Sequence, residues 1–257
     1  EEALAVSIHG KCGQTTAPQN ASATPRGRPT QPRATRLAFV ETVTYREGYV
    51  DQIHLGGASL HGVKVSSVGC YVPPKVLTNE DLERLVETSD EWIMTRVGIK
   101  ERHIAEANVA TSDLAIEAVH AALSNIGASA QDVEAIIVCT VTPDMMFPST
   151  ACIVQDKIGA KGAWGFDLVA ACSGFVYGLT TGAHLVGAGT HRKVLVIGSD
   201  TMSRIIDYTD RATCVIFGDG AGAAIVEASD DPDVGVLDFE NYVDGEFGEA
   251  LQMPAGG

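Results

Sequence analysis

The sequence predicts an α/β fold in which right-handed βαβ units build a mostly parallel sheet. Two continuous apolar runs, at residues 133–141 and 193–198, are typical of strands that are buried on both faces. Segments with helical periodicity lie before, between and after these runs, at the spacing of a βαβ chain. The longest apolar runs are far shorter than the ~20 residues that a membrane-spanning helix needs. We therefore expect no membrane segment.

The chain before the first buried run predicts one strand and two short helices. Residues 63–71 alternate well enough for a strand. Thr78 and Asp81 form a capping-box pattern, which begins a helix. Its apolar face is expected to carry Leu82, Leu85 and Val86. A second short helix is expected over residues 89–96.

Helices and strands then alternate along the rest of the chain. Thr111 or Ser112 is expected to cap a helix that stops at Gly127. The elements expected after it are a strand over 133–141, a helix over 149–158 closed by Gly159, a strand that reaches Ala170, a helix over 173–186, a strand over 193–198 and a last strand over 234–239.

Residues 1–60 differ in composition from the rest, and we interpret them as a leader and linker, with residues 61–257 as the folded part. Between residues 3 and 40 there are five basic side chains, no acidic one and frequent Ser, Thr and Pro. This composition is typical of an organelle transit peptide. A disordered tail without a targeting role is the alternative.

The charge of the folded part argues against a nucleic-acid partner. The net charge of the chain is −15, and residues 61–257 carry twelve basic and twenty-eight acidic side chains. Binding to nucleic acid needs clustered Lys and Arg for the phosphates, so we expect none, although a local basic patch for a phosphorylated ligand remains compatible. The six cysteines form no C-x-x-C motif and no metal-ligand spacing with the histidines, which indicates free thiols in a reducing compartment and no metal site.

Cys172 occupies the most informative position in the sequence. A strand-like run reaches Ala170 and Ala171, and a helix rich in small residues begins directly after the cysteine. A thiol at a helix N-terminus is favoured as the thiolate, which is the nucleophilic form. The local pattern fits a buried structural cysteine equally well, because free Cys is among the most buried residue types.

A dinucleotide site is an alternative use of the glycine-rich segment near the end of the chain. Gly218, Gly220 and Ala223 match G-x-G-x-x-G/A, and Asp238 lies 20 residues after Gly218. Only a few residues separate this segment from the acidic turn at 230–233. That is too few for the helix that such a unit needs, which weighs against this alternative.

Several separate segments resemble, in the same order, the β-ketoacyl-acyl-carrier-protein synthase III family. They are TSDEWIMTRVGI at 88–99, ERHI at 101–104, FPS at 147–149, FDLVAACSGFVYG at 166–178, Asp210-Arg211, and IFGDGAGAA at 216–224. The resemblance covers about residues 62–254. It implies a thiolase-like fold, whose subunit has two similar α/β halves in an α-β-α-β-α layered core, and this chain is expected to supply the first half.

The family resemblance implies an acyltransferase that initiates fatty acid biosynthesis. The cysteine corresponding to Cys172 takes an acetyl group from acetyl-CoA as a thioester. It then passes the group to malonyl-acyl carrier protein with loss of carbon dioxide, which gives acetoacetyl-acyl carrier protein. Acetyl-CoA is a substrate, and no cofactor is expected. Since this pathway is plastidial in plants and algae, the resemblance and the leader together predict the plastid stroma, with the cytoplasm as the alternative.

The resemblance also assigns binding residues. Trp92 and Arg211 are expected to stack on the adenine of CoA, and Thr88 and Arg96 to meet the nucleotide and its phosphates. Without the resemblance, Trp92 is read as an ordinary core or surface aromatic, and the arginines as solvated charges. Phe147 is expected to cross a homodimer interface and line the partner's acyl pocket, whereas an ordinary core Phe is its alternative.

Two residues of the family mechanism have no match here. The histidine and asparagine that promote decarboxylation lie in the family's second half, and no histidine in this sequence occupies their motif. We therefore expect the chain to be a fragment. A related condensing enzyme of the polyketide or hydroxymethylglutaryl-CoA synthase type and a truncated, non-catalytic dimerising protein remain as alternatives.

Overall fold

The computed structural model describes residues 62–231, 234–236, 239, 241, 243 and 245–253. The predicted leader and linker at residues 1–60 lie outside this part of the chain. Within it, no helix is long and apolar enough to cross a membrane.

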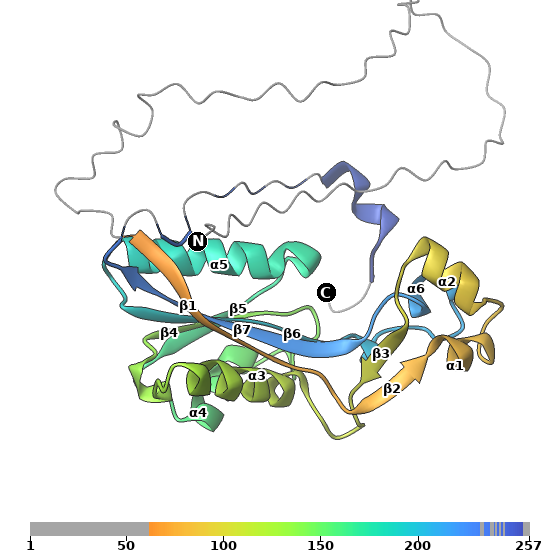
Figure 1. Ribbon diagram of the computed structural model, residues 1–257, viewed down its shortest axis with the longest axis horizontal. Coiled ribbons are helices and arrows are strands. Elements are labelled where there is room, and N and C mark those ends of the chain that lie inside the picture. The colour runs from red at the N-terminus through yellow and green to blue at the C-terminus, as the bar shows by residue number, and fades with distance from the viewer. Residues whose placement is uncertain are drawn as a thin grey trace, which may run out of the picture. The chain divides into compact units, whose positions relative to one another are not determined.

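Five strands form the main sheet, in the spatial order β1-β7-β6-β4-β5 (Figure 1). Their bounds are β1 Gly62–Tyr71, β4 Ala135–Cys139, β5 Trp164–Leu168, β6 Lys193–Thr201 and β7 Asp219–Ser229. β4 is parallel to β5 and β6, whereas β7 is antiparallel to β6 and β1. The α/β class is confirmed, but the sheet is mixed, and the predicted parallel pairing is found only in β5–β4–β6. Residues 202–218, between β6 and β7, contain no helix long enough for a crossover to a parallel strand. β7 therefore begins at the edge where β6 ends and runs antiparallel to it.

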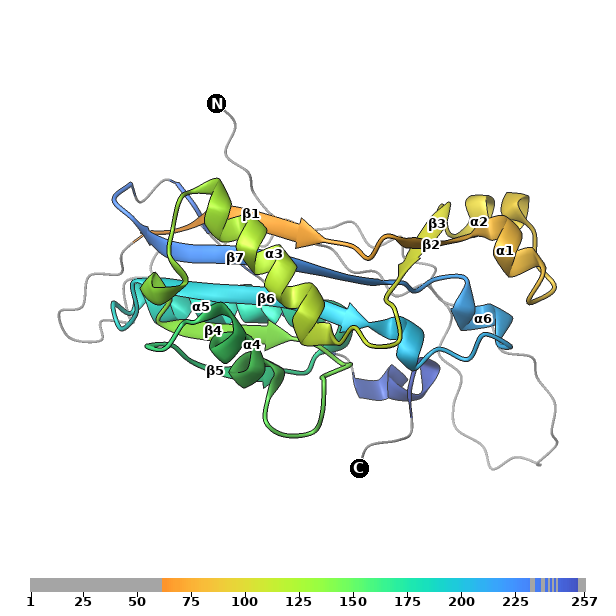
Figure 2. The same cartoon turned by 90° about the horizontal axis from the view of Figure 1, so that it is seen from below.

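Helices cover both faces of this sheet (Figure 1 and Figure 2). α3 (Thr111–Asn125) and α4 (Thr150–Ile158) lie on one face, and α5 (Gly174–Gly187) lies on the other. Successive residues of β4 enter two separate cores, because Ile136 packs with α3 and α4 whereas Ile137 packs with α5. Every residue of β4 is buried, as its continuous apolar sequence predicts.

A small subdomain, formed by residues 75–104 and 211–215, continues from one end of the sheet. It contains β2 Lys75–Thr78, β3 Glu101–Ile104, α1 Asn79–Glu83, α2 Asp90–Arg96 and α6 Arg211–Cys214. β2 and β3 form an antiparallel pair that the sequence did not suggest. The apolar cluster of the subdomain is built on Leu82, Ile93, Cys214 and Val215.

Two helix predictions are confirmed, and one only in part. Ser89 caps α2, and Ser149 caps α4, which ends at Gly159 in the left-handed conformation. The capping box of Thr78 and Asp81 is also present, but α1 ends at Glu83. The predicted apolar face therefore reduces to Leu82, which is buried, while Leu85 lies beyond the helix and is 55% exposed.

The predicted cap of α3 is wrong. Ala110 is the N-cap residue, and its N–H donates to the Asp113 carboxylate at 2.9 Å. The hydroxyls of Thr111 and Ser112 instead reach the segment after β4: Thr111 donates to Thr142 O at 2.5 Å and Ser112 donates to Asp144 at 2.6 Å. Partners this far along the chain cannot be read from a local capping pattern.

The glycine-rich segment that suggested a dinucleotide site is part of a strand. Gly220 and Ala223 lie within β7, which continues to Ser229 between β1 and β6. A dinucleotide loop needs a tight turn from a strand into a helix, so this alternative is wrong. For the last predicted strand, at 234–239, the described residues form no strand, although Val236 N–H donates to Val63 O at 2.7 Å.

α5 lies unusually close to the sheet because one of its faces is made of glycine. Gly174, Gly178 and Gly182 recur every four residues, and all three are buried. A Cβ atom at Gly178 would lie 2.4 Å from Cys139 Sγ, and one at Gly182 would lie 3.0 Å from a Val196 methyl carbon. The helix therefore approaches β4 and β6 at a distance that a larger side chain does not allow.

We predict that Gly178→Ala lowers the free energy of unfolding by ~1–3 kcal/mol, because the added methyl group overpacks the contact with Cys139. Alanine is the better helix former by ~1 kcal/mol, so the sign of the change isolates the packing effect. Urea unfolding of the purified protein measures it. Gly162→Ala is the control, because a Cβ there meets no atom within 4 Å. A Gly178→Ala protein more stable than the parent would contradict this packing.

Candidate active site

Cys172 lies between the end of β5 and the start of α5, as predicted. β5 ends at Leu168, residues Ala171–Ser173 form one 3₁₀ turn, and α5 begins at Gly174. The carboxyl ends of β4, β5 and β6 meet at this edge because the three strands are parallel. The thiol is exposed, so the alternative of a buried structural cysteine is wrong.

The backbone around Cys172 is strained and leaves one donor free. Ala171 has a φ of +44°, in the left-handed region that costs a residue with a Cβ ~1 kcal/mol or more. The turn uses the N–H groups of Ser173 and Gly174, which donate to Ala170 O and Ala171 O. Among the described residues, none accepts from the Cys172 N–H. A backbone donor is therefore available directly beside the sulfur.

A second thiol at the same sheet edge has the opposite environment. Cys139 is the last residue of β4 and is 4% exposed beneath the glycine face of α5. Burial, reinforced by the Asp200 and Asp167 carboxylates, raises the pKa of Cys139 to about 12. This thiol stays neutral near neutral pH and is inaccessible, which leaves Cys172 as the thiol suited to nucleophilic chemistry at this edge.

Carboxylates at the strand ends fix the segments around Cys172. Asp167 on β5 accepts from the N–H groups of Thr150 and Ala151, at 2.6 and 2.7 Å, and so holds the start of α4. Asp200 on β6 accepts from the Val141 N–H at 2.8 Å. Neither role was predicted from the sequence. An acidic residue at or just after a buried apolar run was the available signal, because such a position lies at the carboxyl edge of the sheet.

Three of the four predicted nucleotide contacts come together in the small subdomain. Thr88, Trp92 and Arg211 line an open pocket of about 340 Å³. The Thr88 hydroxyl is buried there and has no partner among the described residues. Arg96, at the end of α2, is exposed and does not line the pocket. The structure therefore groups residues that lie more than a hundred positions apart in the sequence.

Arg211 and Trp92 are in direct contact. The guanidinium carbon lies 4.1 Å from the centroid of the indole, which is a cation–π stack. An aromatic base between them needs a separation of about 7 Å, twice the thickness of one stacked layer. In this conformation the guanidinium occupies the place predicted for the adenine, and the pair must separate to admit a base.

Phe147 is not a core residue, which excludes its alternative. It lies on the segment between β4 and α4 and is 84% exposed, next to Met146 at 76%. Trp164 is also half exposed, on the edge strand β5, where it stacks against Phe166 and donates to His191 at 2.8 Å. Of these apolar side chains, Trp164 lies on the edge strand itself, and Phe147 and Met146 lie on the segment that leads into α4.

The histidines closest to the predicted motifs all have other partners. His103 Nδ1 contacts Pro73 O at 2.6 Å, His184 packs edge-on against Phe239, and His191 accepts from Trp164. Among the described residues, no group of three His, Cys, Asp or Glu side chains could hold a metal ion.

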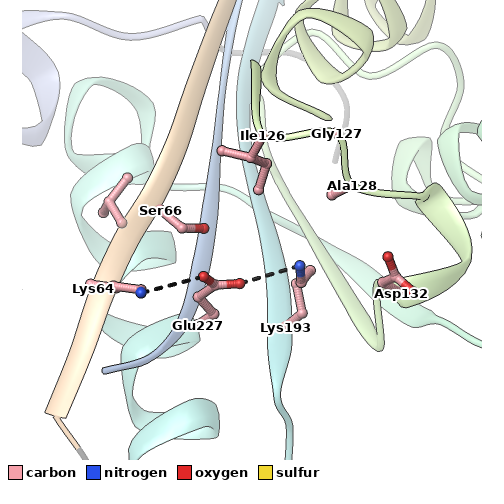
Figure 3. Close-up of a pocket in the computed structure, with 9 residues that line it drawn as sticks. Lys64, Ser66, Ile126, Gly127, Ala128, Asp132, Lys193 and Glu227 are labelled. Atoms are coloured by element: carbon pink, nitrogen blue, oxygen red, sulfur yellow. Dashed lines mark ion pairs between the residues drawn. The ribbon is translucent and has the colours of Figure 1, made fainter. Parts of the chain in front are cut away.

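A larger pocket, of about 620 Å³, lies at the opposite end of the parallel strands (Figure 3). Glu227 at its centre is shared by Lys64 at 3.7 Å and Lys193 at 3.2 Å, and Asp132 adds a second carboxylate. The two cations and two anions balance, so the pocket offers no net charge to a phosphorylated ligand. Lys193 begins β6, so this pocket is separated from Cys172 by the length of the sheet.

The matching family model and the curated relatives carry the same description. The family described as 3-oxoacyl-[acyl-carrier-protein (ACP)] synthase III matches residues 166–245. The β-ketoacyl-[acyl-carrier-protein] synthase III of Solibacter usitatus is 69% identical over 196 residues, which is 76% of this chain and 59% of that protein.

Solved structures match the same region. The 3-oxoacyl-[acyl-carrier-protein] synthase III of Aquifex aeolicus has a TM-score of 0.64 at 48% identity, over 66% of this chain and 55% of that one. The priming β-ketosynthase of the R1128 polyketide pathway has a TM-score of 0.67 at 35% identity, over 69% of this chain and 53% of that one.

The sheet, its helical layers and the cysteine at the β5–α5 junction therefore define a thiolase-like α/β protein. Within that class, the chain belongs to the β-ketoacyl-acyl-carrier-protein synthase III family. It spans about 59% of the length of the Solibacter relative.

Proposed function

We propose that this protein performs the acyl-transfer step of a β-ketoacyl-acyl-carrier-protein synthase III, with Cys172 as the nucleophile. The Cys172 thiolate attacks the carbonyl carbon of acetyl-CoA, the bond from that carbon to the CoA sulfur breaks, and the CoA thiolate leaves and takes up a proton. The acetyl group remains on Cys172 as a thioester. The observation that carries the proposal is an exposed thiol beside a free backbone N–H at the strand-to-helix junction.

The free N–H of Cys172 suits the charge that develops in this step. Attack on the thioester places negative charge on its carbonyl oxygen, and a fixed backbone donor stabilises that oxyanion without reorganising. One such donor lowers the barrier by ~3 kcal/mol. The strained Ala171 supports the proposal, because it holds the turn that leaves this N–H unpaired.

We place the nucleotide of CoA at the small subdomain. The indole of Trp92 and the guanidinium of Arg211 both offer flat faces to an adenine, which enters when the pair separates. The unpartnered Thr88 hydroxyl supplies a polar contact in the same pocket. We propose that Arg96, on the exposed end of α2, meets phosphate oxygens of the nucleotide.

The condensation step needs a histidine and an asparagine whose family motifs this sequence does not match. In that step malonyl-acyl carrier protein loses carbon dioxide, its carbanion attacks the acetyl carbonyl, and the bond to Cys172 breaks to give acetoacetyl-acyl carrier protein. The family uses a histidine and an asparagine here, and His103, His184 and His191 are engaged elsewhere. We propose that residues 61–257 form the first half of a two-half enzyme and that the second half supplies both groups.

We propose a homodimer that pairs through the β5 edge of the sheet. β5 has a neighbour on one side only, and unpaired strand edges favour pairing with another chain. Trp164 exposes apolar surface on this strand, and Phe147 and Met146 expose more on the segment that leads into α4. In this arrangement Phe147 lines the acyl pocket of the partner.

A priming polyketide synthase is the second candidate, because the R1128 enzyme shares the fold at 35% identity. The two candidates differ in the acyl group that the cysteine accepts, so competition between acetyl-CoA and longer acyl-CoA esters distinguishes them. The plastid location stays a prediction that rests on residues 3–40 and on the pathway's location in plants and algae.

We predict that Cys172→Ala abolishes the radioactive acetyl-protein adduct that forms with labelled acetyl-CoA, because the attacking sulfur is removed. Scintillation counting of the gel-separated protein measures the adduct. Cys152→Ala is the control, since Cys152 is another exposed thiol and should leave labelling at the parent level. Retained labelling in Cys172→Ala rules out Cys172 as the nucleophile.

We predict that Phe147→Asp converts the dimer to monomer, because a carboxylate would then be buried at the interface. Sedimentation velocity measures the change. Leu85→Asp replaces an exposed apolar residue of the small subdomain and should remain a dimer. A monomeric parent protein, or a dimer unaffected by Phe147→Asp, contradicts the proposed interface.

A further inference from the structure

Arg102, on β3, is a buried cation that no carboxylate contacts among the described residues. It is 2% exposed, and its guanidinium donates to Asn79 Oδ1 and to Val215 O. Desolvation by the surrounding protein lowers the pKa of Arg102. A buried cation lowers the stability of the fold unless hydrogen-bond acceptors surround it in good geometry. The acceptors of Arg102 therefore identify the segments that it connects.

Asn79 links Arg102 to a third side chain by hydrogen bonds. Asn79 is also 2% exposed, and its Nδ2 donates to Asp90 Oδ1 at 2.7 Å and to Ile99 O at 3.0 Å. Arginine can only donate and a carboxylate can only accept, so the orientation of the amide between them is fixed. Arginine, amide and carboxylate thus form one directed chain of hydrogen bonds, which we call the Arg102 relay.

The Arg102 relay connects α2 and α6, which carry Trp92 and Arg211. Asp90 is the first residue of α2, two positions before Trp92. Val215 directly follows α6, the helix that begins with Arg211. Both helices have at most two turns and are too short to be stable alone. Their positions depend on contacts with the rest of the subdomain.

We propose that Arg102 is a positioning residue that, through Asn79 and Asp90, sets the place of Trp92 relative to Arg211. This inference rests on the proposed function for its consequence, because the same pair forms the adenine slot of CoA. The apolar cluster of Leu82 and Ile93 packs the subdomain together, whereas the hydrogen bonds of the relay have direction and fix its register.

Asp90 offers the cleanest test, because it is exposed and outside the pocket lining. Asp90→Ala removes the acceptor at the end of the Arg102 relay. Asp90→Asn keeps an oxygen that accepts from Asn79. Glu91→Ala is the matched control, since it removes the same charge from the same first turn of α2 without touching Asn79.

The first measurement is made without ligand. In a Trp164→Phe background Trp92 is the single tryptophan, and acrylamide quenching reports how well Arg211 covers it. We expect Asp90→Ala to raise the quenching constant toward that of Arg211→Ala, and Asp90→Asn and Glu91→Ala to match the parent. Unchanged quenching in Asp90→Ala, or an equal rise in Glu91→Ala, overturns the inference. Arg102→Met is a second variant that should behave as Asp90→Ala does.

The second measurement is a titration with CoA. We expect Asp90→Ala to weaken binding about fivefold, the equivalent of one cation–π contact, and Asp90→Asn to restore it. If Trp92→Ala binds CoA as tightly as the parent, the proposed nucleotide site is wrong. The quenching measurement then still tests whether the Arg102 relay positions Trp92. If Trp92→Ala loses binding while Asp90→Ala does not, the relay fails and the site stands.

Discussion

The close contact between α5 and the sheet decides where the reactive thiol lies. Gly178 packs so tightly over Cys139 that no side chain fits between them. This contact fixes the height of α5 above β4, and with it the turn that carries Cys172. It also buries Cys139, whose pKa is raised to about 12. Two cysteines at one sheet edge thus differ in access: the glycine face of α5 buries Cys139, whereas Cys172 precedes that helix and is exposed.

The site is assembled from two parts of the fold with different construction. The sheet edge is held by carboxylates such as Asp167 and Asp200, which accept from backbone N–H groups of neighbouring segments. The small subdomain is held by an apolar cluster and by the Arg102 relay. We propose that the edge performs the acyl transfer and the subdomain binds the nucleotide. On this proposal, the Arg102 relay affects the binding of the nucleotide, whereas the glycine face of α5 affects the acyl transfer.

The features that were predicted correctly are those that depend on residues close together in the sequence. The buried strands, the end of α4 at Gly159 and the junction at Cys172 follow from apolar runs, helix stop signals and small residues. The errors concern contacts between distant segments. Residues 219–224 look like a loop because they are rich in glycine, yet they belong to a strand in which Ala223 pairs with Gly69 and Gly222 pairs with Gly198 on the two neighbouring strands. Arg211 alone looks like a surface charge, and only the fold brings it to Trp92. The resemblance supplied that pairing, and it also supplied the catalytic role of Cys172, which the local pattern left undecided.

We propose that Cys172 accepts an acetyl group and that the groups for condensation come from a second half of the enzyme. Incubation of the purified protein with acetyl-CoA and malonyl-acyl carrier protein, followed for both free CoA and carbon dioxide, tests the claim directly. The account predicts release of CoA up to one equivalent of Cys172, with no carbon dioxide and no acetoacetyl-acyl carrier protein. Sustained carbon dioxide release that depends on malonyl-acyl carrier protein would contradict it.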